Sequence, residues 1–152
     1  MTYRSSNQAV AVINSKSGKV TVKGAGSATI TASASEGENY HKTTASYRIT
    51  VGKAANKITA SNYSKISNGK TQSFTMKYSR LGGAKMTFKS NRGGVKVNSA
   101  GKVTISATFV GKATITLTAV ESKNYKTASL KRYITVNPAP ISISSLKNDV
   151  GR

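Results

Sequence analysis

Hydrophobic and polar residues alternate along nearly every segment of the chain. From Ala113 to Ala119 the apolar residues fall on odd numbers and threonines on even numbers, and Ala28 to Ala34 repeat the pattern with smaller side chains. A period of two places one set of side chains toward a core and the other toward water, as in a half-buried strand. The alternation therefore predicts antiparallel β-strands.

Turn-forming residues separate these segments, among them Asn68-Gly69 and Gly82-Gly83. No stretch shows the 3.6-residue period of a helix, and short strands between such turns indicate an antiparallel β-sandwich. In the second half of the chain the pattern predicts strands near residues 57–61, 72–79, 85–90, 94–98, 102–107, 112–120 and 128–136.

The same sequence block occurs twice. Residues 26–51 align without a gap with residues 111–136, at an offset of 85, and 12 of the 26 positions are identical. Upstream, residues 1–7 match 86–91 and residues 18–22 match 101–105. A fixed period of this length indicates tandem modules.

The repeat divides the chain into three parts. Residues 1–53 form a partial module, 54–137 a complete one, and 138–152 a junction with the start of a further repeat. The first module has no counterpart of residues 57–85, so we expect it to lack its first strands and to have an open edge. Such an edge invites pairing with another strand. Residues 140–146, PISISSL, alternate in the same way and are a candidate donor, more readily between molecules than within one.

Several side-chain positions follow from the alternation. Val20 and Val22 are expected to face the core, and Phe74, Met76 and Tyr78 to lie along one strand that the first module lacks. Arg132 interrupts the pattern at a core position, which predicts a place near an open end of the sandwich. The linkers are short: residues 52–56 follow the first copy, and the two prolines of residues 137–140 stiffen the equivalent stretch after the second copy.

The charge is strongly positive. The chain carries 24 Lys and Arg against four acidic residues, giving a formal net charge of +20. The basic residues are spread out, which is typical of solvated strand faces. They also favour weak, non-specific attraction to a polyanion such as an anionic wall polymer, a glycan or nucleic acid.

Two further features limit the possible environments. The chain has no cysteine, and no apolar run approaches the roughly 18–20 residues of a membrane span. The first residues lack the basic start and apolar core of a signal peptide.

Catalytic chemistry finds little support in the sequence. His41 and Asp149 are the one histidine and the one aspartate, and position 126, which aligns with His41, is a lysine. Glu36 and Glu38 resemble an acid–base pair, but Lys123 replaces Glu38 in the second copy. Four scattered acidic residues do not supply the clustered oxygen ligands of a calcium site. We expect no catalytic, cofactor-binding or metal-binding residues, and so no enzyme and no cofactor.

Matched residues in one loop have structural interpretations. Tyr40 and Tyr125 each follow an asparagine and precede a final strand, where a tyrosine hydroxyl often bonds to nearby backbone. Carbohydrate stacking by these tyrosines is a weaker alternative. Glu36 and Glu121 could promote a Lys–Asn amide crosslink only if their carboxyl groups pointed inward.

The blocks SSNQAVAV at residues 5–12, GKVT at 18–21 and GAGSATIT at 24–31 carry a family resemblance. They are similar to the group 2 bacterial Ig-like repeats, which occur in intimin- and invasin-type adhesins and in Gram-positive surface proteins. The second copy follows the pattern more loosely. The resemblance implies tandem Ig-like sandwiches, an extracellular or cell-surface location and no catalytic residues.

The sequence thus favours a non-enzymatic spacer module of a bacterial surface or secreted protein, with a contribution to adhesion. A basic binding module for anionic polymers is one alternative, and a decoration domain on a phage particle is another. The composition does not separate these functions, because fold alone does not give function.

Overall fold

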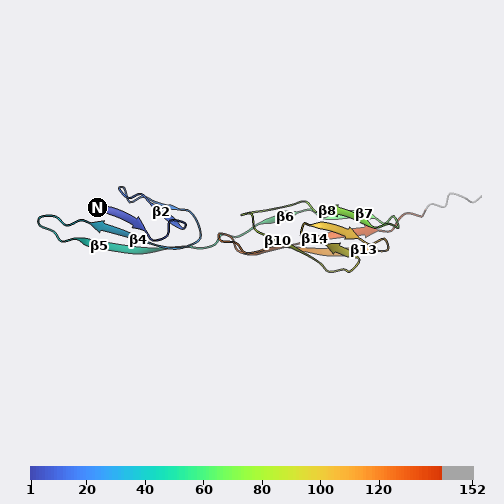
Figure 1. Ribbon diagram of the computed structural model, residues 1–152. Coiled ribbons are helices and arrows are strands. Elements are labelled where there is room, and N and C mark those ends of the chain that lie inside the picture. The colour runs from blue at the N-terminus through green and yellow to red at the C-terminus, as the bar shows by residue number, and fades with distance from the viewer. Residues whose placement is uncertain (142–152) are drawn as a thin grey trace, which may run out of the picture. The chain divides into compact units, whose positions relative to one another are not determined.

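The computed structural model describes residues 1–141, and in that range every regular element is a strand. The described chain falls into two compact units. Unit 1 comprises Met1–Lys57, Arg80–Lys85 and Ala119–Ala128, and unit 2 comprises Ile58–Ser79, Met86–Thr118 and the chain from Ser129 onward. The predicted all-β fold of tandem sandwiches, the first of them incomplete, is confirmed (Figure 1). The module boundaries given by the repeat remain a prediction.

Unit 1 is built from the first five strands, which form two small sheets. The strands are β1 (Thr2–Ser5), β2 (Ala11–Ile13), β3 (Val20–Val22), β4 (Gly26–Ala34) and β5 (Thr43–Val51). One sheet has the order β1-β4-β5 and the other pairs β2 with β3, all antiparallel. Strand β4 is therefore central, and β5 stands at the edge of its sheet.

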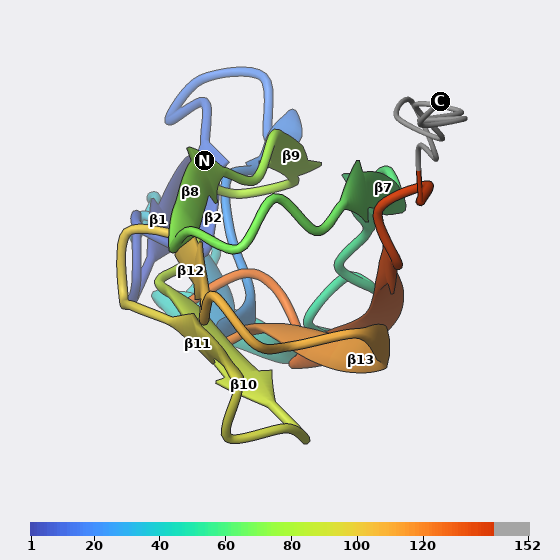
Figure 2. The same cartoon turned by 90° about the vertical axis from the view of Figure 1, so that its right-hand side faces the viewer.

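The remaining strands lie wholly or almost wholly in unit 2. They are β6 (Ile58–Ala60), β7 (Tyr63–Ile66), β8 (Gln72–Thr75), β9 (Tyr78–Arg80), β10 (Met86–Ser90), β11 (Val95–Val97), β12 (Lys102–Ile105), β13 (Gly111–Ala119) and β14 (Ala128–Asn137). The sheets have the orders β10-β13-β14-β7, β11-β12-β8 and β6-β9. In the view of Figure 2, β7 stands at the far end of its sheet from β10.

Strand β7 differs from the sequence prediction in two ways. No strand was expected at residues 63–66, and β7 pairs with β14 in parallel, from Ile134 opposite Tyr63 to Asn137 opposite Ile66. The polar sequence Tyr-Ser-Lys-Ile shows little alternation, because an edge strand with an exposed Ile66 needs few apolar residues. Parallel pairing requires a long crossover, which residues 67–127 provide.

The core of unit 2 follows the predicted alternation. The four odd-numbered apolar residues of β13, Ala113 to Ala119, are fully buried, and Ile134 and Val136 of β14 join them. Met76 is buried, with Phe74 and Tyr78 half-buried on either side of it, so these three residues face inward. The expected single strand 72–79 is, however, divided into β8 and β9 at Met76 and Lys77.

The core of unit 1 is smaller. Val10, Ala11 and Ala28 form a buried cluster, against which Val20, Ile49 and Val51 pack while partly exposed. The prediction for Val22 was wrong: its side chain is 54% exposed, whereas its counterpart Ile105 in the second copy is 1% exposed. Strand β8 pairs along β12 beside Ile105, and no described strand occupies the equivalent edge of β3.

Arg132 is accommodated at its core-facing position because nearby backbone carbonyls accept hydrogen bonds from its guanidinium group. The residue is half-buried, its Nε donates a hydrogen bond to the carbonyl of Ala60 in β6, and its Nη1 donates to the carbonyl of Lys131. A buried guanidinium without acceptors would be costly, so these carbonyls explain how arginine is accommodated there.

The difference in burial between matched positions gives a first prediction. Ile105→Ala should destabilise its repeat by about 2–4 kcal/mol, because it leaves a cavity in a closed core. The matched substitution Val22→Ala should cost less than about 1 kcal/mol, since that side chain is already in water. Denaturant unfolding followed by NMR signals from each unit separates the two effects. Equal losses of unfolding free energy in the two variants would contradict the conclusion that the first module is open beside Val22.

Candidate functional site

The residues that could form a catalytic group do not converge. His41 and Glu36 are both exposed, with His41 Nδ1 3.7 Å from Glu36 Oε1, and Glu38 is exposed as well. Asp149 lies outside the described residues. The two side chains therefore form an exposed contact at the surface of the loop.

Metal ligands are equally scattered. Among residues 1–141 no group of three or more His, Cys, Asp or Glu side chains lies close enough to hold a metal ion. This arrangement agrees with the acidic residues being spread along a basic chain.

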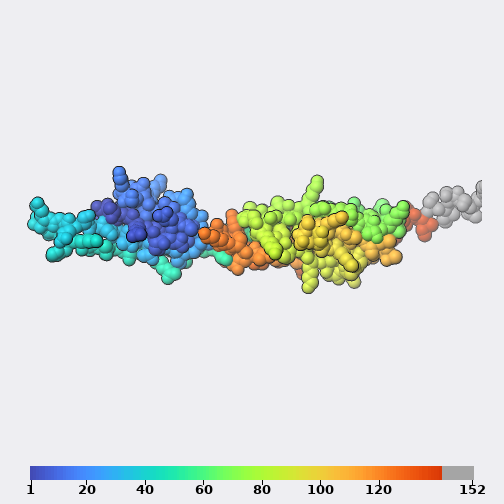
Figure 3. Space-filling model, in the orientation of Figure 1, coloured from blue at the N-terminus to red at the C-terminus, as the bar shows by residue number. Residues whose placement is uncertain are grey.

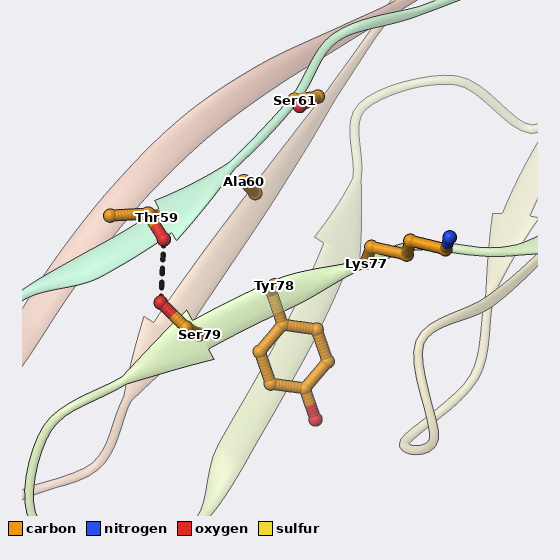
Figure 4. Close-up of a pocket in the computed structure, with 6 residues that line it drawn as sticks. All are labelled: Thr59, Ala60, Ser61, Lys77, Tyr78 and Ser79. Atoms are coloured by element: carbon orange, nitrogen blue, oxygen red, sulfur yellow. Dashed lines mark hydrogen bonds between the residues drawn. The ribbon is translucent and has the colours of Figure 1, made fainter.

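An open hollow of about 310 Å³ lies over strands β6 and β9 (Figure 4). Small side chains line most of it, together with Lys77 and Tyr78, and Thr59 Oγ1 lies 2.6 Å from Ser79 Oγ across the two strands. The lining contains a lysine and hydroxyl groups but no carboxylate or imidazole.

The most highly organised polar cluster belongs to the loop of the second copy and lies within unit 1. The backbone of Ala54 forms a parallel bridge with Tyr125: Ala54 N donates to the carbonyl of Asn124 at 2.9 Å, and Lys126 N donates to the carbonyl of Ala54 at 2.8 Å. The side-chain Oδ1 of Asn124 accepts a hydrogen bond of 2.9 Å from Ala25 N. The loop around Tyr125 thus forms hydrogen bonds both with the linker at Ala54 and with the turn at Ala25.

The Tyr125 ring completes this cluster by packing. Gly82 has a φ of 65°, and a Cβ at that position would overlap the ring. Glycine is needed at residue 82 both for its backbone conformation and for this close approach. Neither Tyr40 nor Tyr125 donates a hydroxyl hydrogen bond among the described residues, so the ring rather than the hydroxyl places Tyr125.

An ion pair lies at the same loop. Lys53 Nζ donates a hydrogen bond of 2.8 Å to Glu121 Oε1. That hydrogen bond, and then the positive charge of Lys53, lower the pKa of the Glu121 carboxyl below its ordinary value, and slight desolvation opposes the shift. Both side chains remain substantially exposed, so the pair contributes little to stability.

The matched loop in the first copy makes none of these contacts within the described residues. Tyr40 is 79% exposed and bonds only locally, through a two-way backbone bridge with Gly37. The loop stands out from the surface of unit 1, where it is drawn in cyan in Figure 3. The Glu36 and Glu121 side chains are both exposed, so neither presents the inward-pointing carboxyl that an amide crosslink requires.

Sequence reasoning missed an apolar groove on unit 1, although it predicted the missing strands that leave the groove open. The groove has a volume of about 160 Å³ and is lined by Tyr3, Ile13, Gly18, Ile30, Ala32, Ala45, Ser46 and Tyr47. Its residues come from both sheets of the unit.

Residues 1–141 contain no helix that is both long enough and apolar enough to cross a membrane.

The comparisons with known proteins are limited in extent. The family model for the intimin immunoglobulin-like domain matches residues 1–36. No curated protein matches the chain. Among solved structures, the chain is similar to the Drosophila N-cadherin fragments EC1-4 and EC1-3, at 14% and 16% identity with a TM-score of 0.41 for each. It is also similar to domains 4-9 of the surface layer protein SbsC, at 20% identity and a TM-score of 0.39.

These structures are longer than the chain. The alignments cover 90%, 91% and 91% of this chain but 41%, 55% and 22% of EC1-4, EC1-3 and the SbsC fragment, respectively. At such identities and scores the structural matches do not bear on what the chain binds or does. The intimin match supports a relationship to bacterial Ig-like domains over the first strands alone.

The Lys53–Glu121 pair gives a prediction about pH. Because the folded-state pKa of Glu121 is lowered, its small contribution to stability is present above the ordinary value of about 4.5 and is lost as the pH falls through the lowered value. Lys53→Ala should raise the Glu121 pKa toward that ordinary value, as measured by NMR titration of the carboxyl carbon. An unchanged Glu121 pKa in this variant would show that the ion pair does not form in solution.

Proposed function

We propose that the chain is a non-enzymatic structural module of a bacterial surface or secreted protein, where it spaces a functional domain from its support. The observation that carries the proposal is the linker between the two copies of the repeat. Lys53 and Ala54 are held by side-chain and backbone bonds rather than left as a loose tether. A spacer needs connections of this kind, because a free linker lets the chain coil up.

The linker geometry depends on the backbone of one residue. Ala54 uses both its N–H and its carbonyl, each bonded to the loop around Tyr125. In the stretch after the second copy, Ala139 holds the equivalent position between Pro138 and Pro140. The prolines restrict φ on either side while leaving the alanine N–H available. An alanine is therefore present after the second copy at the position matching Ala54, the residue that forms both backbone hydrogen bonds.

A surface location is supported by the intimin family match over the first strands and by the resemblance of residues 5–31 to bacterial Ig-like repeats. Adhesion is a further proposed role of the same protein, to which the exposed basic faces would contribute. The alternative of a phage decoration domain shares these features and remains a prediction.

Attraction to anionic polymers is a second candidate function, favoured by the charge of +20. Exposed lysines without a shaped pocket attract a polyanion through long-range charge and counterion release. Lysine is a strongly hydrated point charge that lacks the bidentate geometry of arginine, which favours attraction without sequence or sugar specificity. On a cell surface, such attraction would help to hold a spacer close to its wall.

Spacing can be tested with the chain inserted between a membrane anchor and a terminal epitope on a cell surface. A Gly/Ser chain of the same length has a root-mean-square extension of roughly 70 Å. We expect the protein to hold the epitope measurably farther from the membrane than this chain does, as seen by fluorescence localisation of a bound antibody. An epitope no farther out than with the Gly/Ser chain would contradict the proposal.

The linker itself offers a matched pair of variants. Ala54→Pro removes the N–H that bonds Asn124 and should raise the mobility of residues 53–57, lowering their NMR order parameters below the roughly 0.85 of rigid backbone. Ala55→Pro should leave the order parameters unchanged, since Pro140 occupies the matched position in the second copy. Equal effects of the two prolines would argue against the Ala54 bridge.

Binding to anionic polymer should be weak and strongly salt-dependent. We expect retention on heparin or on a teichoic-acid-like polymer at low salt that is lost well below about 0.5 M, because exposed charges are screened there. Retention above that concentration would instead indicate a shaped binding site.

A further inference from the structure

Strand β5 leaves one edge of unit 1 unpaired over nine residues. It stands at the end of the sheet β1-β4-β5, and its pairing with β4 runs without interruption from Thr43 to Val51 (Figure 1). Strand β5 contains no proline and no bulge, which are features that block further pairing at many sheet edges. Within the described part of the chain, this edge is therefore regular and open to a further strand.

The backbone groups that point to this edge belong to the even-numbered residues of β5. Thr29 lies opposite Arg48, and its N–H and carbonyl are both bonded to Ser6, on the side away from β5. The N–H and carbonyl of Arg48 therefore point to the outer edge, and the alternation of an antiparallel ladder directs those of residues 44, 46 and 50 the same way.

The matched edge in the second copy shows that a strand fits at this place in the fold. Strand β14 aligns with β5 in the repeat, and β7 pairs with it along residues 134–137. Tyr133, which matches Arg48, donates its N–H to Asn62 Oδ1 just before β7. In unit 1 no described strand occupies the equivalent place beside β5.

The side chains of β5 that face the first core are incompletely covered. Tyr47 is 55% exposed and Ala45 is exposed, and both line the apolar groove on unit 1. Ile49 is half-buried, whereas the matched Ile134 in the second copy is fully buried. A strand added beside β5 would therefore cover apolar surface as well as bond to the free backbone groups.

The sequence of β5 is complementary to itself in one antiparallel register. Even-numbered residues must lie opposite even-numbered residues, because these carry the outward backbone groups. Of the registers that meet this condition, only the one centred on Tyr47 pairs all nine residues of β5. It places Ala45 opposite Ile49 on the apolar face and Ser46 opposite Arg48 on the outer face. A register centred on Arg48 would instead oppose two guanidinium groups, which is unfavourable.

We propose that the outer edge of β5 binds β5 of a second copy of this chain. The two strands pair antiparallel about a two-fold axis at Tyr47 and join the β1-β4-β5 sheets of two molecules. Both copies use the same surface, so the interface is closed and gives a dimer rather than a fibre. The two Tyr47 rings meet at a non-hydrogen-bonded pair, where cross-strand side chains lie closest, and extend the apolar lining of both grooves. This association goes beyond the spacing role, because it makes unit 1 a contact between molecules.

Charge distinguishes this association from attraction to a polyanion. The net charge of +20 on each chain opposes the approach of a second copy, and salt screens that repulsion. Dimerisation should therefore strengthen with added salt, whereas retention on an anionic polymer weakens. The one charged side chain of β5 is directed back onto its own sheet, since Arg48 Nη2 donates a hydrogen bond of 3.1 Å to Ser27 Oγ.

The strand donor expected from the sequence, residues 140–146, lies almost entirely outside the described residues. Strand β5 is the better-supported occupant, because its free edge is described and its own sequence supplies a register with full overlap. Pairing with the tail would not bring two β5 strands together, so the cysteine test below separates the two occupants.

Single cysteine variants of the full chain test both the contact and its register. The chain has no cysteine of its own, so a disulfide in a single variant joins two molecules. Tyr47→Cys places both sulfur atoms at the two-fold axis, where the Cβ separation of a non-hydrogen-bonded pair suits a disulfide. With oxidised glutathione at about 0.3 M salt, this variant should form a covalent dimer at least about tenfold faster than Ala45→Cys does.

Ala45→Cys is the matched control, because it lies on the same strand and the same face. In the proposed register the two copies of residue 45 are four residues apart along the paired strands, about 13 Å, which is too far for a disulfide. Equal rates for the two variants, or a faster rate for Ala45→Cys, would overturn the proposal.

A second pair of variants tests the backbone pairing. Arg48→Pro removes an N–H at the outer edge of β5 and keeps the β4–β5 ladder, since proline is tolerated at edge positions whose N–H faces solvent. It should weaken dimerisation by about tenfold or more, through the lost hydrogen bonds and the blocked edge. Arg48→Ala retains the N–H and removes the same charge, so its dimer should be at least as stable as the original. Equal weakening by the two substitutions would contradict pairing through the edge.

The unmodified chain supplies a readout that does not depend on a variant. Sedimentation at about 0.3 M salt should show a monomer–dimer equilibrium with a dissociation constant of about 1 mM or lower. As the concentration rises, hydrogen exchange should slow at residues 44, 46, 48 and 50 and stay unchanged in β14. A chain that remains monomeric up to about 1 mM overturns the proposal. A dimer that leaves exchange in β5 unchanged overturns it equally.

Discussion

The apolar face of a central strand must be covered by a second layer, and this constraint governs both units. In the second copy, β13 presents Ala113, Ile115, Leu117 and Ala119, and all four are fully buried. In the first copy, Ala28 and Ile30 of β4 are buried while Ala32 and Ala34 are half-buried. The two strands, identical at six of nine positions, thus have different surroundings, because only β13 has the covering segment Ile58–Arg80.

The thin cores are extended by the basic side chains themselves. Lys112 Nζ lies 3.8 Å from the centre of the Tyr133 ring, and Lys65 Nζ lies 5.4 Å from that of Phe74. Such contacts place the ammonium group over the face of an aromatic ring, which attracts the cation electrostatically. A chain with a net charge of +20 can therefore use part of its charge to shield apolar surface.

Much of the fold could be predicted from the sequence, because period-two alternation and internal repetition are local signals. Residues 113–119 identified a central strand, and the offset of 85 identified its copy. The polar strand β7 could not be predicted, since it is held by pairing with β14 rather than by its own apolar residues. The burial of Val22 was predicted wrongly for a related reason. Alternation gives the sheet face on which a side chain lies, but it does not show whether another strand covers that face.

The site was less predictable than the fold. The matched loops containing Tyr40 and Tyr125 were recognisable from the repeat. Which loop has partners depends on Ala54, Ala25 and Gly82, all distant in sequence from Tyr125. The groove on unit 1 follows from the difference between two copies, which needs the arrangement of both to be seen.

Hydrogen exchange of the full chain tests most directly whether the covering segment determines the stability of each copy. Strands β4 and β13 are identical at six of nine matched positions, and amides within the identical stretch have similar intrinsic exchange rates. The account predicts exchange at least about tenfold slower in β13, because opening it requires separating a complete core. Equal rates in the two strands, or slower exchange in β4, would contradict it.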